Sequence, residues 1–165
     1  MKKTCYIVLM TALALINVGC SSNPQNADKG PSSAVAGNSR TSALDNDPSV
    51  KKMKVRLTVY WANGKGTDRW SRKMQSSTGE QLVSSKSAAV DPKVITYGSK
   101  IIVPEIGHEF VAMDTGSAVI SRKASRRDGN RCPVVDIFFK DKNEALKWAS
   151  NNPSYVTVYI NTPEG

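Results

Sequence analysis

Six short runs of β-branched and aromatic residues, separated by turn-forming segments, constrain the fold of this chain more than any other feature. The runs cover residues 55–61, 88–90, 100–103, 110–113, 134–139 and 155–160. Valine, isoleucine, threonine and the aromatic residues favour strands, and the glycines between the runs favour turns. The runs do not alternate with helical segments, as the strands of a parallel α/β sheet do. We therefore expect a mainly β protein, either a small barrel or a sandwich.

One helix is predicted directly after the fifth run. Asp141 can cap its first turn, and Glu144 stands three residues later, where a capping-box partner belongs. Apolar residues at 145, 146, 148 and 149 supply one side of this helix. The predicted folded domain covers residues 51–165, which is long enough to bury a core without disulfides.

Three aspartates occur at or in the expected strands. Asp91 follows the run 88–90, Asp114 follows the run 110–113, and Asp136 lies in the middle of the fifth run. Each has an ordinary structural interpretation. Asp-Pro and Asp-Thr-Gly sequences commonly form Asx turns, and an aspartate within a strand can pair with an arginine.

Asp136 has a second, chemical interpretation. Side chains alternate along a strand, so Asp136 shares a face with Val134 and Phe138. Desolvation on an apolar face raises the pKa of a carboxyl, and a second carboxylate nearby raises it further. A carboxyl with a raised pKa can act as a general acid near neutral pH.

Taken in order, the contexts of the three aspartates resemble the three-aspartate (3D) domain. Asp91 stands in AVDPKVI, Asp114 in DTGSA and Asp136 in VDIFF, followed by EAL in the predicted helix. The 3D domain forms the catalytic part of membrane-bound lytic transglycosylase A and of related small bacterial cell-wall proteins. The resemblance covers roughly residues 55–160. It implies a six-stranded double-psi β-barrel with one or two short helices that acts on the glycan strands of peptidoglycan.

The resemblance also implies roles for the aspartates. Asp136 would be the acid and base that cleaves the β-1,4 bond between N-acetylmuramic acid and N-acetylglucosamine with a 1,6-anhydro product. Asp114 would hold Asp136 in place and raise its pKa, or stabilise oxocarbenium-like charge. Asp91 would support the same cleft.

Substrate contacts are expected from four further residues. Aromatic rings can stack on sugars, and Trp61 and Tyr97 are the predicted aromatic contacts. Tyr60 and Trp70 are further candidates, but neighbours on a strand point to opposite faces, so either Tyr60 or Trp61 belongs to the core. Thr115 and Gly116 follow Asp114 directly and complete the expected binding residues.

A basic segment, residues 119–133, departs from the family pattern, in which a shorter turn joins the second and third aspartates. It carries five cations, Arg122, Lys123, Arg126, Arg127 and Arg131. One interpretation is a solvated loop, because loops accept insertions at little cost. The other is a basic flap over the cleft that contacts an anionic wall polymer. No role is assigned to Cys132 in this segment.

The amino terminus reads as an export signal. Two lysines precede an apolar run at residues 6–16, which is too short for a typical transmembrane helix. Cys20 after Gly19 resembles a bacterial lipobox, although Asn17 stands where that motif usually has leucine. We expect a lipoprotein-type signal peptide at 1–19 and a lipid on Cys20. The protein would then be anchored at the periplasmic face of an envelope membrane or the outer face of the cell membrane.

The segment 20–50 is predicted to be a flexible linker. It is rich in serine, asparagine, alanine, glycine and proline and has no sustained apolar period. A linker of this kind would let a lipid-anchored domain reach a target some distance from the membrane.

Composition excludes several other functions. The chain has one histidine, three cysteines and no CxxC pair, so neither a histidine-rich metal site nor a structural zinc is expected. No cofactor is expected either. The net charge of +9 alone would suggest nucleic acid, but export makes an anionic wall the better partner. We expect a monomer.

Two other functions remain open. The sequence around Asp114 (AMDTGS) matches the aspartic-protease signature, so a homodimer could share a proton between two copies of Asp114. A non-catalytic, expansin-like module that binds cell-wall glycan would also suit the basic charge.

Overall fold

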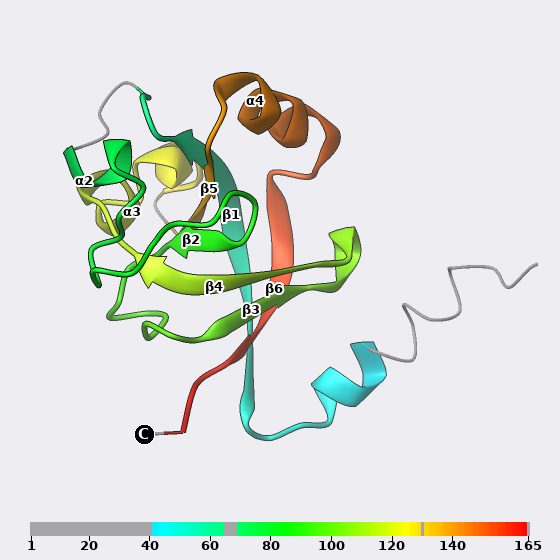
Figure 1. The fold of residues 1–165 in the computed structure, drawn as a ribbon. Helices are drawn as coiled ribbons and strands as arrows, with labels where there is room; N and C mark the ends of the chain where they lie inside the picture. Colours follow the sequence, from blue (N-terminus) through cyan, green and yellow to red (C-terminus); the bar gives the residue numbers. More distant parts are fainter. Residues whose placement is uncertain (1–40, 65–68, 130, 165) are drawn as a thin grey trace, which may run out of the picture. The chain divides into compact units, whose positions relative to one another are not determined.

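Across residues 41–64, 69–129 and 131–164, which the computed structural model describes, six strands close into a barrel (Figure 1). They are β1 (Val50–Trp61), β2 (Ser87–Ala89), β3 (Lys100–Val103), β4 (His108–Asp114), β5 (Val134–Phe139) and β6 (Tyr155–Asn161). Their order around the barrel is β1-β5-β2-β4-β3-β6, with β6 paired back to β1. β1 runs parallel to β5 and β2 parallel to β4, whereas the other neighbours are antiparallel. The expected mainly β barrel is confirmed.

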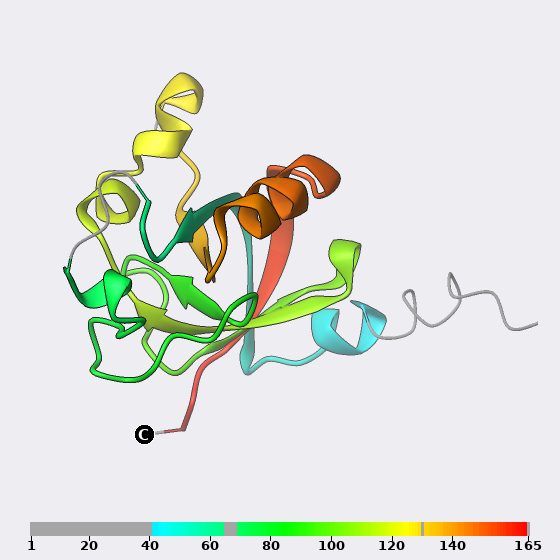
Figure 2. The ribbon, with the colours of Figure 1, turned by 45° about the horizontal axis from the view of Figure 1, so that its top comes forward.

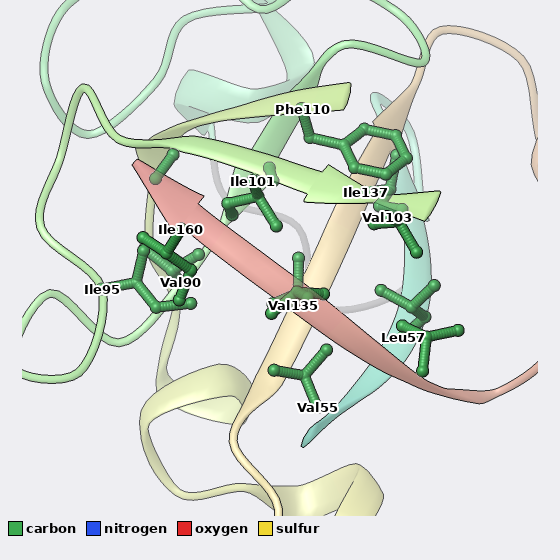
Figure 3. Packing of buried hydrophobic residues seen from close by; sticks show 14 of the residues in the cluster. Val55, Leu57, Val90, Ile95, Ile101, Val103, Phe110, Val135, Ile137 and Ile160 are labelled. Carbon is green, nitrogen blue, oxygen red and sulfur yellow. The ribbon is translucent and has the colours of Figure 1, made fainter. Parts of the chain in front are cut away.

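Alternate residues of the strands fill the barrel interior, where side chains from all sides converge (Figure 3). The inward positions of β1 and β5 are Val55, Leu57, Val135, Ile137 and Phe139. Each of these side chains is less than 5% exposed, so the barrel is a packed core rather than a channel. The residues between them therefore point outward, and the outward positions of β1 and β5 carry the polar groups described below.

Short helical turns connect the strands. They are α2 (Arg69–Arg72), α3 (Ser117–Ile120) and α4 (Lys142–Asn151), with the 3-10 turns η1 (Pro104–Ile106) and η2 (Lys123–Asp128). The predicted helix after the fifth run is α4, and its cap is as expected. Asp141 accepts hydrogen bonds from the backbone N–H groups of Asn143 at 2.8 Å and Glu144 at 3.0 Å.

Replacing this cap tests the local account of α4. Asp141→Ala leaves the first-turn N–H groups without their acceptor, so the free energy of unfolding should fall by about 1 kcal/mol. Asp141→Asn keeps an acceptor oxygen and should behave like the wild type. Urea denaturation measures both, and an unchanged midpoint for Asp141→Ala would contradict the capping role.

The structure describes residues 41–50 of the expected linker. Residues 41–45 are helical, and the Asp45 carboxylate accepts hydrogen bonds from Lys52 Nζ at 2.6 Å and the Tyr159 hydroxyl at 2.8 Å. This end of the segment is therefore held against β1 and β6. The predicted signal peptide, Cys20 and the remainder of the linker lie outside the described residues. Within the described ranges, no helix has both the length and the hydrophobicity to cross a membrane.

Candidate active site

Asp136 lies on the outer face of β5, between two neighbouring strands. Its sequence neighbours Val135 and Ile137 point into the core, so Asp136 points away from it. The register places Thr58 of β1 opposite Asp136 on one side and Ala89 of β2 opposite it on the other. Alternation along the strand had predicted that Asp136 shares its face with Val134 and Phe138, and those two side chains lie in clusters outside the barrel core.

Burial sets the proton affinity of Asp136. Desolvation and, to a smaller extent, the negative charge of Asp114 raise the pKa of Asp136 from 3.8 to about 6. The Thr58 hydroxyl opposes this rise, because it donates a 2.7 Å hydrogen bond to Asp136 Oδ1 and so favours the ionised form. A carboxyl that titrates near pH 6 can both donate and accept a proton in a slightly acidic or neutral medium.

Asp114 is the last residue of β4, and its carboxylate accepts more hydrogen bonds than that of Asp136. It is only 5% exposed, and each of its carboxylate oxygens accepts a hydrogen bond. The Tyr60 hydroxyl donates to Oδ2 at 2.7 Å, and the backbone N–H of Ser77 donates to Oδ1 at 2.9 Å. One donor on each oxygen suits an ionised carboxylate, which only accepts hydrogen bonds. The two carboxyls therefore have different environments.

A β-bulge brings these two aspartates to the same row of the sheet. Ala88 pairs with Ala112, but the next residue, Ala89, pairs with Asp114, so the register skips Met113. Ala89 also pairs with Asp136 on its other side. The carboxyls thus flank one alanine, whose small side chain leaves space between them. This placement explains why the charge of Asp114 affects the pKa of Asp136.

The polar segment 75–81 covers Asp114. Its ends join through a bridge between Gln75 and Gln81, and the Thr78 hydroxyl donates to the Met113 carbonyl at 3.1 Å. Tyr97, an expected substrate contact, lies beside this segment with its hydroxyl 3.3 Å from Ser77 Oγ. Tyr97 is thus connected to Asp114 through Ser77.

Asp91 lies beside the pair but engages its carboxylate elsewhere. Asp91 Oδ1 accepts the N–H of Lys93 at 3.0 Å, which is the Asx turn that the structural interpretation predicts. The residue before it, Val90, contacts the site directly. Val90 donates its N–H to the Asp114 carbonyl at 2.9 Å, and the Thr115 hydroxyl donates to the Val90 carbonyl at 2.7 Å. Val90 and Thr115 therefore support the backbone around Asp114, and Asp91 stabilises the turn that follows Val90.

A pocket of about 290 Å³ opens beside Asp136. Its lining is Thr58, Val59, Ala118, Val119, Lys123, Ala124, Val134 and Asp136. One wall comes from the basic segment 119–133, because η2 contacts β1 and α3 contacts β5. The turns of α3 and η2 are drawn in yellow-green and yellow in Figure 2. Val119 is buried there and Lys123 lines the pocket, so this part of the segment borders the site, although Ile120 and Lys123 are themselves exposed to solvent.

Gly116 precedes α3 in an extended conformation, at φ −169° and ψ 154°. Any residue can adopt such angles, and an added Cβ would meet no atom within 4 Å. Neither backbone strain nor close packing therefore requires glycine at this position.

The structure separates the two neighbouring aromatic residues of β1. Trp61, the expected substrate contact, pairs with Phe139 and packs against the barrel core. Tyr60 points outward, and its hydroxyl donates a hydrogen bond to Asp114. Thr58 was not among the predicted site residues, and Tyr60 was a candidate for sugar stacking, not for a contact with Asp114. The inward phase of Val55 and Leu57 is the signal that could have placed both on the outer face, next to Asp136.

The single histidine of the chain takes no part in this site. The Nδ1 atom of His108 lies 2.7 Å from the Ile106 carbonyl, and its ring packs against Phe110 and Trp148. Within the described part of the chain, no group of three or more histidine, cysteine, aspartate or glutamate side chains could hold a metal ion.

The hydrogen bond from Thr58 makes a testable prediction about Asp136. Thr58→Val removes the donor that favours the ionised form, so the pKa of Asp136 should rise above about 6. Thr58→Ser keeps the hydroxyl and should leave the pKa unchanged. NMR titration of the Asp136 carboxyl carbon measures both variants, and equal pKa values in Thr58→Val and the wild type would contradict this role.

Comparison with known proteins agrees with the arrangement of the aspartates. Residues 86–161, which include Asp91, Asp114 and Asp136, match the family model of the 3D domain. Two Bacillus subtilis (strain 168) proteins are similar to this chain. "Putative cell wall shaping protein YabE" is 32% identical over 130 residues, which cover 76% of this chain and 28% of YabE. "Cell wall-binding protein YocH" is 34% identical over 110 residues, which cover 65% of this chain and 32% of YocH. The match thus spans about a third or less of each relative.

Proposed function

Because this chain is a 3D-domain protein, we propose that it acts on the bacterial cell wall as a peptidoglycan lytic transglycosylase. It would cleave the β-1,4 bond between N-acetylmuramic acid and N-acetylglucosamine. The observation that carries this proposal is the unequal pair of carboxyls. Asp136 has a pKa raised to about 6 and lines a pocket, and Asp114 is fixed beside it by two donors.

Asp136 would act first as an acid and then as a base. In its protonated form it donates a proton to the departing glycosidic oxygen, and the bond between that oxygen and C1 breaks. The resulting carboxylate then accepts the proton of the muramic acid's own 6-hydroxyl as that oxygen bonds to C1. The product is a 1,6-anhydro end, Asp136 is protonated again, and no water is consumed. A single carboxyl near pH 6 is sufficient for both steps.

Asp114 would assist without transferring a proton. Its negative charge keeps Asp136 protonated to higher pH. The same charge can stabilise the oxocarbenium-like centre that develops at C1, because a fixed charge in a partly buried site needs little reorganisation. Tyr60 and Ser77 hold Asp114 for both tasks and would be positioning residues.

The proposed location is outside the cytoplasm. A lipid on Cys20 would anchor the protein to a membrane, and the linker would let the domain reach the wall as a monomer. The names of both Bacillus relatives refer to the cell wall, which supports this location.

The observations support one alternative function and disfavour another. A non-catalytic wall-binding module is supported by the name of YocH. A homodimeric protease is disfavoured, because a shared proton requires two aspartates in contact across an interface. Asp114 is only 5% exposed, and both of its oxygens are bonded within its own chain.

Digestion of purified sacculi, followed by mass spectrometry of the soluble fragments, distinguishes these functions. Fragments with 1,6-anhydro ends are the expected result. Reducing ends would instead indicate a hydrolase, and cut peptides would indicate a protease. Binding to sacculi without any released fragment would indicate a wall-binding module.

A further inference from the structure

Another pocket, of about 560 Å³, lies between the end of the basic segment and strands β1 and β6. Its lining is Lys54, Arg127, Gly129, Arg131, Cys132 and Tyr155. Three of these six residues are cations, and they come from β1 and from the segment that follows Ser125. The size lies within the range of pockets that hold small ligands or parts of larger ones.

No counter-charge is paired with this pocket's cations among the described side chains, which do not include that of Asp128. The Arg56 guanidinium lies 4.6 Å from the centre of the Tyr155 ring, and Lys54 Nζ lies 5.8 Å from the same ring. The Nε atom of Arg56 is buried and has no hydrogen-bond partner among the described residues. Among the described side chains, no carboxylate forms an ion pair with Lys54, Arg56, Arg127 or Arg131. Like charges held together in this way favour an anionic ligand.

The pocket adjoins the candidate active site along two elements. Lys54, Arg56 and Thr58 are alternate residues of β1, and Thr58 lines the pocket of Asp136. The four residue steps from Lys54 to Thr58 span about 13 Å of strand, the length of a few sugar units. The turn η2 also borders both sites, because Lys123 lines the Asp136 pocket and Arg127 lines the basic one.

We propose that Lys54, Arg56, Arg127, Arg131 and Tyr155 form a basic subsite for the carboxylates of the peptides that hang from the glycan strand held at Asp136. This inference rests on the proposed function for its ligand. Arginine forks pair with carboxylates through two parallel hydrogen bonds, and the Tyr155 face offers an apolar surface for the peptide beside them. The spacing along β1 favours an anion on the same strand over a separate polymer.

Binding of the full chain to purified sacculi tests this subsite. The measurements use an Asp136→Asn background, so that cleavage does not remove the ligand. Arg127→Gln with Arg131→Gln should weaken binding by about tenfold or more, because each arginine loses a charge-assisted contact. The matched control is Lys142→Gln with Lys147→Gln, which removes the same charge from exposed positions of α4. Equal losses in the two double variants would overturn the proposal, because only net charge would then matter.

Treatment of the sacculi identifies the source of the anion. Removal of the peptides with an amidase should weaken the binding of the protein that keeps Arg127 and Arg131. Its binding should then equal that of the Arg127/Arg131 double variant. If removal of phosphate-containing polymers abolishes that difference and removal of the peptides does not, the ligand is a phosphate polymer and the proposal is wrong. A wild type that releases no anhydro fragments would overturn the proposed function alone. The binding difference would still report on the subsite.

Discussion

Asp136→Asn should reduce the release of anhydro-ended fragments from sacculi by about 10²- to 10⁴-fold, the usual contribution of general acid–base catalysis. The amide cannot donate a proton to the glycosidic oxygen or accept one from the 6-hydroxyl. The matched control is Asp91→Asn. Its side-chain oxygen can still accept the Lys93 N–H, so its activity should stay within a few-fold of the wild type. Cleavage by Asp136→Asn at the wild-type rate would refute the assignment.

The same substitution should stabilise the fold at neutral pH. A folded pKa of about 6 against 3.8 means that the folded state holds a proton that the unfolded state releases between these values. Stability therefore falls as the pH rises from 3.8 to about 6, and the full cost of burying the ionised group remains above that.

At pH 7, Asp136→Asn should raise the free energy of unfolding by up to about 3 kcal/mol. Below pH 3.8, where the wild-type carboxyl is protonated in both states, the two proteins should be nearly equal. Urea midpoints at both pH values measure this. A variant less stable than the wild type at pH 7 would mean that the ionised carboxylate supports the fold.

Asp114→Asn should have the second largest effect. It removes the charge that raises the pKa of Asp136, so the pH above which cleavage declines should move down. It also removes a charge that would stabilise the developing cation. Together these losses should reduce the rate at pH 7 by about 10²-fold.

The pH profile of cleavage distinguishes this role from a purely structural one. Tyr60→Phe is the comparison variant, because it removes one donor from Asp114 and keeps the charge. It should therefore move the profile much less than Asp114→Asn does. If Asp114→Asn left the profile in place while lowering the rate, Asp114 would not act through the pKa of Asp136.

Local patterns were enough to predict much of this fold and part of the site. Alternation placed Asp136 on the same strand face as Val134 and Phe138, and the capping residues placed the start of α4 at Asp141. The placement of Asp114 and Asp136 on either side of Ala89 was not predictable in this way. It depends on a bulge in the pairing of β2 with β4, which residues distant in sequence determine together.

The sequence left open which of Tyr60 and Trp61 belongs to the core. Both rings are large enough to stack on a sugar, and alternation says only that they face opposite ways. Val55 and Leu57 point into the core, and alternation places Trp61 on the same face of β1. Continuing that phase along β1 would have placed Tyr60 on the outer face, where its hydroxyl donates to Asp114.

The basic segment 119–133 carried two interpretations that composition could not separate. Charged residues are equally compatible with a solvated loop and with a flap, because their long side chains can lie along a surface and keep their charge in water. Tertiary packing buries Val119 and Ser125, and it places Lys123 in the lining of the Asp136 pocket. These placements connect the segment to the site.

The most direct test of the proposed activity is digestion of sacculi in heavy-oxygen water by the wild type and by Asp136→Asn. A lytic transglycosylase consumes no water, so the wild type should release anhydro-ended fragments without heavy oxygen at the new end, and the variant should release almost none. Heavy oxygen at a newly formed reducing end, or equal release by both proteins, would contradict the mechanism in which Asp136 is the acid and base.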